Sequence, residues 1–119
     1  MKYIFTPTSA FKKSAKRLKK KYKSLPKDIA EFLRNFQENP SIGVDLGSGF
    51  RKIRMEISSK NKGKSGGARI ITYELYVKEV ENTTDILLVE IYDKSEKESI
   101  GEKRINQIVQ SYLNDFLDR

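Results

Sequence analysis

Cysteine, histidine and tryptophan are all absent from this chain of 119 residues. Without cysteine the protein forms no disulfide and has no thiolate chemistry. The absence of histidine removes the commonest general base, the commonest zinc ligand and the usual catalytic triads. No apolar run approaches the ~20 residues that a membrane span requires, and the opening Met-Lys-Tyr-Ile-Phe-Thr-Pro is too short for a signal peptide. We therefore expect a cytoplasmic protein with no membrane partner, no metal ion and no cofactor.

Acidic residues are scarce in two segments of a chain whose net charge is +8 and whose pI is about 9.6. Residues 1–23 carry nine cations and no acid, and residues 50–69 carry seven cations and one acid, Glu56. Positive charge concentrated in this way favours a polyanionic partner: nucleic acid, the ribosome, an anionic membrane or an acidic protein. At this length we expect a single domain over residues 1–119.

The N-terminal third predicts a strand followed by two helices. Residues 3–6 favour a short strand that Pro7 closes, and Thr8 or Ser9 can cap the helix that follows. Pro26 suits the first turn of a second helix, and the short link predicts that the two helices pack antiparallel as a hairpin. Apolar residues at helical spacing define the two inward faces, Phe11, Ala15, Leu18 and Tyr22 in the first helix and Ile29, Phe32, Leu33 and Phe36 in the second.

The rest of the chain predicts a three-stranded antiparallel meander and a final helix, which makes the fold class α+β. After a loop over residues 41–49, apolar and charged residues alternate along residues 50–57, and residues 68–77 are rich in β-formers. Between these strands, residues 58–67 contain no apolar residue and three glycines, which predicts a flexible hairpin loop. Residues 86–92 are almost continuously apolar, as expected of a central strand covered on both faces with the first strand beside it. The last helix is expected to turn inward Ile105, Ile108, Val109, Tyr112, Leu113, Phe116 and Leu117.

Positive side chains gather on the predicted hairpin. The alternation along its first strand places Lys52 and Arg54 on the wet face. Arg69 opens the next strand beside two glycines, where its planar guanidinium could clamp a phosphate. Tyr92 is interpreted either as a core aromatic residue or as a base-stacking or proton-transfer group. The residues predicted to bind RNA are Arg51, Lys60, Lys62, Lys64, Tyr92, Lys12, Lys16, Lys19 and Lys20. The alternatives are solvated lysines throughout or, for the first helix, a membrane-surface helix.

The strand Gly-Phe-Arg-Lys-Ile-Arg-Met-Glu-Ile, the glycine-rich loop and the strand Ala-Arg-Ile-Ile-Thr-Tyr, followed later by Leu-Val-Glu-Ile-Tyr-Asp-Lys-Ser-Glu-Lys, resemble the RelE/ParE toxin superfamily, and within it the HigB-like branch. The resemblance implies a RelE-like microbial ribonuclease fold and the toxin of a type II toxin–antitoxin system. Such toxins are ribosome-dependent endoribonucleases (mRNA interferases) that cut messenger RNA, inhibit translation and arrest growth. The implied partners are the ribosome, mRNA and a cognate antitoxin, often a helix-turn-helix protein in this branch.

The resemblance assigns the catalytic positions to Lys52, Arg54, Arg69 and Lys94. The expected reaction is attack of the RNA 2′-hydroxyl on the adjacent phosphorus, which leaves a 2′,3′-cyclic phosphate. Arg54 and Arg69 would stabilise the charge that develops, and Lys52 or Lys94 would move protons because crowded cations disfavour one another's charge. The chain departs from the family pattern in two places: a tyrosine near the start of the last helix falls at residues 100–101, which are Ile-Gly, and the histidine of some members has no counterpart. The alternatives are a non-catalytic nucleic-acid or ribosome binder and a ParE-like gyrase inhibitor, since fold does not decide activity.

Overall fold

The computed structural model describes residues 2–78 and 81–117. The elements are, in order, β1 (Lys2–Pro7), α1 (Ser9–Lys21), α2 (Leu25–Glu38), β2 (Val44–Gly47), β3 (Phe50–Met55), the 3₁₀ turn η1 (Ser58–Lys60), β4 (Ala68–Lys78), β5 (Thr83–Asp93) and α3 (Glu102–Leu117). The predicted α+β order of strand, two helices, antiparallel strands and final helix is confirmed. No helix in the described ranges is long and apolar enough to cross a membrane.

One mixed sheet of five strands holds the fold together, in the order β1-β5-β4-β3-β2. β1 pairs with β5 in parallel, and the other neighbours are antiparallel. The prediction that the first strand lies beside the apolar strand of residues 86–92 is therefore confirmed. β5 is buried along almost its whole length, as its apolar sequence predicts for a strand covered on both faces.

The prediction of a loop over residues 41–49 is wrong in part, because Val44–Gly47 forms β2 and the meander has four strands rather than three. β2 was missed because its four residues are all exposed, so no burial pattern marks them. Ser48 and Gly49 both have positive φ in the turn to β3, as a two-residue hairpin of type I′ requires. β2 forms the edge of the sheet beyond β3.

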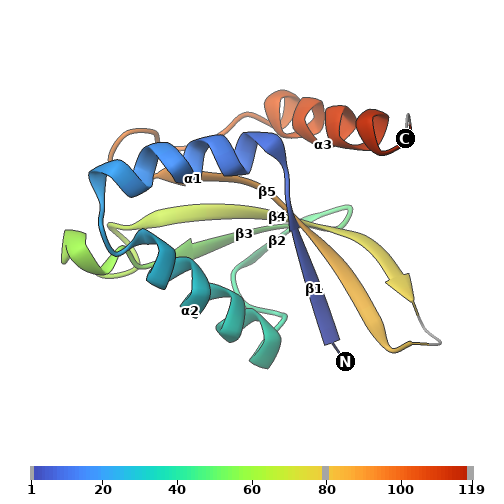
Figure 1. The fold of residues 1–119 in the computed structure, drawn as a ribbon, viewed down its shortest axis with the longest axis horizontal. Coiled ribbons are helices and arrows are strands. Elements are labelled where there is room, and N and C mark those ends of the chain that lie inside the picture. Colours follow the sequence, from blue (N-terminus) through green and yellow to red (C-terminus); the bar gives the residue numbers. More distant parts are fainter. Residues whose placement is uncertain (1, 79–80, 118–119) are drawn as a thin grey trace.

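Helices cover both faces of the sheet (Figure 1). One apolar cluster joins Phe11 and Leu18 of α1, and Phe32 and Phe36 of α2, to strand residues such as Ile70. The second cluster joins Ile105, Ile108 and Val109 of α3 to the opposite side of the sheet at Ile71, Leu87 and Val89. We call these two sides the helix-pair face and the α3 face.

Each helix confirms most of its predicted inner face. Ala15, Tyr22, Ile29 and Leu33 are partly buried against the first cluster, and Tyr112 and Leu113 against the second. The prediction is wrong for the end of α3, where Phe116 and Leu117 are 58% and 76% exposed. The strand residues of the second cluster are covered by earlier turns of α3, so the last turn has no sheet residue of that cluster to pack on. Thr8 is the N-cap of α1, as predicted, and its hydroxyl bonds Val89 of β5.

Candidate functional site

The strand register places the predicted catalytic residues on the α3 face. Arg54 of β3 lies opposite Arg69 of β4, and Arg69 lies opposite Tyr92 of β5. Lys52 lies in the next row, opposite the buried Ile71. Directly opposed residues of antiparallel strands point to the same side, so all of these side chains share the face on which Ile71 packs. Two arginines in direct opposition repel each other, which makes this row unusual for a purely structural sheet.

Arg69 is 5% exposed and is bound by its own loop. Its Nη1 donates to the carbonyl oxygens of Lys64 and Ala68, both at 3.2 Å, and its Nη2 donates to that of Ser65 at 3.1 Å. The expected fork held open for a phosphate is therefore largely occupied by backbone. Arg69 holds residues 64–69 against the sheet, and the exposed cation of the row is Arg54.

Lys94 follows β5, two residues beyond Tyr92. Its backbone N–H bonds the carbonyl of Gly67, and its ammonium donates to the carbonyl of Glu98 at 3.2 Å. Lys94 is only half-buried. The structure thus brings Lys52, Arg54 and Arg69 to one end of the α3 face, and Lys94 follows the last residue of β5. Arg54 and Lys52 are the least constrained of the four.

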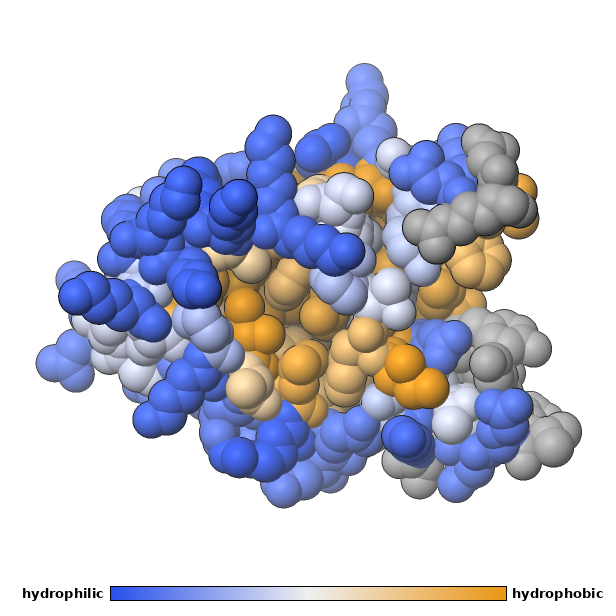
Figure 2. All heavy atoms as spheres, in the orientation of Figure 1, coloured by the Kyte–Doolittle hydropathy of each residue, from blue (hydrophilic) through white to orange (hydrophobic). Residues whose placement is uncertain are grey.

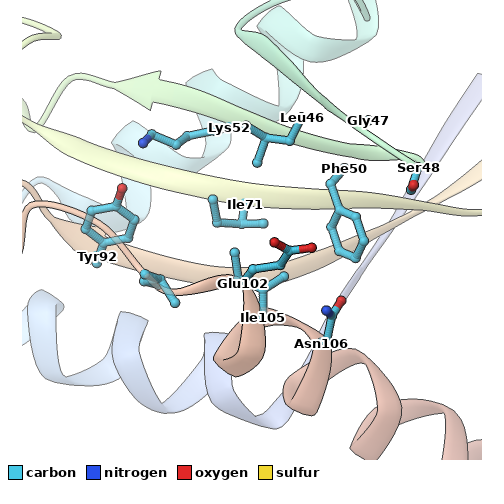
Figure 3. A pocket seen from close by; sticks show the side chains of 11 residues that line it. Leu46, Gly47, Ser48, Phe50, Lys52, Ile71, Tyr92, Glu102, Ile105 and Asn106 are labelled. Atoms are coloured by element: carbon cyan, nitrogen blue, oxygen red, sulfur yellow. The ribbon is translucent and has the colours of Figure 1, made fainter.

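An open cavity of about 490 Å³ lies beside this row, between β2, β3, β5 and the start of α3 (Figure 3). Its apolar walls include Leu46, Phe50 and Ile71. Lys52 and Tyr92 line one part of the cavity, and Glu102 and Asn106 of α3 line another (Figure 3). A cavity with apolar walls and a few polar groups is typical of a small-ligand site. Sequence reasoning missed Glu102 and Asn106, because only the packing of α3 brings them to the strands.

Tyr92 is 3% exposed, and its hydroxyl is buried without a hydrogen-bond partner among the described residues. Burial raises the pKa of Tyr92 above its usual value, while the nearby Arg69 opposes that rise. The hydroxyl therefore stays protonated at neutral pH and is available as a donor. A buried polar group without a partner is rare and costs stability, so it is a candidate for contact with a ligand. As a buried residue, Tyr92 offers a cavity wall rather than an exposed stacking surface.

Asp93, the next residue, points to the helix-pair face and is fully buried. Its carboxylate accepts from Lys60 Nζ at 2.6 Å, Tyr22 Oη at 2.5 Å and Ser95 Oγ at 2.8 Å. Burial alone would raise the pKa of Asp93, but the hydrogen bonds from Lys60, Tyr22 and Ser95 outweigh it and hold the pKa well below its usual range. Lys60, expected among the RNA-binding cations, is instead the buried partner of Asp93, with its side chain 9% exposed.

The segment predicted as a flexible hairpin loop is tied down at its start. Asp28 of α2 accepts from the backbone N–H of Ser58 at 2.9 Å and from its hydroxyl at 2.6 Å. Ser59 donates its N–H to the hydroxyl of Ser24, so η1 is fastened beside the link between α1 and α2 (Figure 1). These contacts join residues about thirty positions apart, which no local sequence pattern reveals.

The remaining cations fall into two groups. Arg51 lies on the helix-pair face and donates to the carbonyls of Ser41 and Ile42, so it is separated from its neighbour Lys52. Exposed lysines cover α1 and the hairpin loop, and Figure 2 shows hydrophilic side chains gathered over α1 at the upper left. The exposed members of the predicted RNA-binding set are Lys12, Lys16, Lys19, Lys20, Lys62 and Lys64.

The described residues contain no group of three or more acidic side chains placed to hold a metal ion. The chain matches no protein-family model, and it has no significant match among curated proteins. The site is therefore interpreted from its own geometry and charge.

Proposed function

We propose that this chain is a RelE-like toxin of the HigB-like branch, a ribosome-dependent endoribonuclease that cleaves mRNA without a metal ion. The observation that carries the proposal is the cationic row on the α3 face, where Arg54, Arg69 and Tyr92 lie in register beside an open cavity lined by Lys52. The exposed Arg54, with the buried charge of Arg69 opposite it, favours an anion on this face.

In the proposed reaction the 2′-oxygen of the RNA attacks the adjacent phosphorus. The bond from phosphorus to the 5′-oxygen of the next nucleotide breaks, which leaves a 2′,3′-cyclic phosphate and a free 5′-hydroxyl. A base takes the proton of the 2′-hydroxyl and an acid returns one to the leaving oxygen, so the step is balanced without a co-reactant. The exposed Arg54 is best placed to stabilise the phosphorane charge.

The other residues of the face support this step. Lys52 and Lys94 are the candidates for proton transfer, as the resemblance implies. The protonated hydroxyl of Tyr92 can donate to a phosphate oxygen or to the leaving oxygen. Arg69 positions the loop at residues 64–69 and adds positive charge behind the row. The exposed lysines of α1 and the loop would bind the phosphates of RNA on the ribosome.

Growth and cleavage together test the proposal. Induced expression should arrest bacterial growth, and co-expression of the adjacent reading frame, the expected antitoxin, should relieve the arrest. Primer extension on a translated message should show cuts that fall by on the order of a hundredfold in Arg54→Ala, the usual scale for one lost stabilising donor.

The matched control is Arg34→Ala, which removes an exposed arginine from α2, outside the cationic row, and should cleave like the wild type. Normal growth with soluble protein would contradict the toxin assignment. Growth arrest without any mRNA cleavage would favour the gyrase inhibitor, which a supercoiling assay detects.

A further inference from the structure

The side chains that line the cavity beside the cationic row differ in chemistry from one end of the cavity to the other. The Lys52 ammonium and the Tyr92 hydroxyl lie toward one end, whereas the Glu102 carboxylate, the Asn106 amide and the Phe50 ring lie toward the other (Figure 3). Among the described residues, no ion pair joins the Lys52 ammonium to the Glu102 carboxylate. Glu102 is an exposed residue in the first turn of α3, so its carboxylate can accept hydrogen bonds from a ligand in the cavity.

Phe50 provides an apolar surface in this cavity. Its ring packs against Tyr73 with the centroids 4.6 Å apart and the planes tilted by 37°, and the ring is only partly buried. Leu46 of the edge strand is 48% exposed and lines the same cavity. A flat aromatic wall of this kind binds a nucleobase by stacking, at about 1–3 kcal/mol per base.

We propose that this cavity binds a guanine base of the RNA, with Glu102 as the residue that selects it. The inference rests on the proposed function, because the base must belong to a nucleotide whose phosphate lies on the Lys52 and Arg54 end. The carboxylate of Glu102 has only acceptors when ionised. Guanine presents two adjacent donors on its Watson–Crick edge, N1–H and the N2 amino group, and can satisfy both carboxylate oxygens.

The other bases fit Glu102 less well. Adenine and cytosine each place a ring-nitrogen acceptor next to their amino group, and that acceptor faces a carboxylate oxygen unfavourably. Uracil offers one donor flanked by two carbonyl oxygens. Asn106, one turn along α3 from Glu102, can donate to a guanine carbonyl but could also pair with adenine. Adenine is therefore the competitor to exclude.

Titration of the wild-type protein with 3′-GMP and with 3′-AMP, followed by NMR, tests the assignment without the ribosome. We expect 3′-GMP to bind at least about tenfold more tightly, the scale of one bidentate base contact, with shifts at Phe50, Glu102 and Asn106. Glu102→Gln should remove most of the preference, because the Gln amide offers guanine only one acceptor and can itself pair with adenine. Asp115→Asn is the matched control, since Asp115 is an exposed carboxylate of the same helix outside the cavity, and it should keep the preference.

Equal affinity for the two nucleotides in the wild type would overturn the guanine assignment, and this comparison needs no variant to fold. An unchanged preference in Glu102→Gln would overturn the role of Glu102. Neither result touches the proposed ribonuclease, which depends on growth arrest and mRNA cleavage. Tight 3′-GMP binding by a protein that cleaves no message would support the base site and contradict the proposed function.

Discussion

Tyr92 and Asp93 are neighbours at the end of β5, and their side chains enter opposite faces of the sheet. Asp93 is surrounded by donors from Tyr22, Lys60 and Ser95, whereas the Tyr92 hydroxyl has no partner among the described residues. Both groups are buried, so burial does not explain the difference. The helix-pair face uses its polar groups to stabilise the fold, whereas on the α3 face the Tyr92 hydroxyl and the cation Lys52 belong to residues that line an open cavity. A site that keeps unsatisfied polar groups at a cost in stability is one that a ligand can complete.

The largest expected effect comes from a substitution on the helix-pair face, where the buried polar groups have hydrogen-bond partners. Asp93→Ala leaves the ammonium of Lys60 buried without its carboxylate, and losing one partner of a buried pair costs about 3–5 kcal/mol. Urea unfolding should show this loss of stability. Glu96→Ala, which removes the solvent-accessible ion pairs with Arg17 and Lys21, should cost about 1 kcal/mol or less. Equal costs for the two variants would contradict a structural centre at Asp93.

The Asp93 carboxylate should also make the stability of the folded protein depend on pH in the acidic range. Because the pKa of Asp93 is held below its usual value in the folded protein, the folded state binds a proton less readily than the unfolded chain does. Its stabilisation is therefore complete well above about pH 4 and is lost as the pH falls below that value. Asp93→Ala should unfold with a flatter acid dependence than the wild type.

Substitutions of the two opposed arginines should differ in effect: loss of Arg69 should lower stability, and loss of Arg54 should lower activity. Arg69→Ala frees three carbonyl oxygens from a buried guanidinium, which we expect to cost about 2–3 kcal/mol of unfolding free energy. Arg69→Lys should recover little of it, since a point charge cannot serve three acceptors in one plane. Arg54→Ala should lose cleavage without losing stability, because Arg54 is exposed. A stable Arg69→Ala variant would contradict its role in holding the loop.

Matched Tyr→Phe changes compare the two faces directly. Tyr92→Phe removes a hydroxyl that has no partner in the described structure, so stability should be unchanged or rise by about 1 kcal/mol while cleavage falls. Tyr22→Phe removes the donor to Asp93 and should cost about 1.5–3 kcal/mol. Thermal unfolding measures both. A clear loss of stability in Tyr92→Phe would show that its hydroxyl is already satisfied.

The smallest effects concern the exposed lysines. If Lys62 and Lys64 bind RNA phosphates, each change to Gln should reduce the log–log salt slope of RNA binding by about 0.7. Lys60→Gln is the internal control, because its ammonium is occupied by Asp93, and the folded variant should keep the wild-type slope. Filter binding of single-stranded RNA across salt concentrations gives the three slopes. Identical slopes in all three variants would assign Lys62 and Lys64 to a solvated surface.

The predicted and observed secondary structures agree where apolar residues recur with a helical or strand period. α1, α2 and the two long strands lie where Phe11, Phe32 and the run at residues 86–92 predicted them. β2 was missed because Val44 and Leu46 are 62% and 48% exposed, and an exposed edge strand leaves no pattern of burial to detect. Phe116 was assigned to the core because a helical period continues in the sequence beyond the point where the sheet residues are already covered.

The candidate site was predictable only in part. The alternation in β3 placed Lys52 and Arg54 on one side because side chains of a strand alternate whatever lies next to them. Glu102 escaped notice because its relevance depends on where α3 packs. The Asp28 contacts to Ser58 were equally hidden, since they join a helix to a turn thirty positions away.

The sequence by itself determined the order of the elements, the apolar faces and the concentration of positive charge, because these follow from local periodicity and composition. Only the tertiary structure decided which cations are available. Lys60 is paired with a carboxylate 33 positions away, Arg69 is bound by backbone carbonyls, and Arg54 remains exposed. All three carry the same formal charge in the sequence. Whether that charge stabilises the fold or can reach a ligand depends on which groups folding brings within hydrogen-bonding distance.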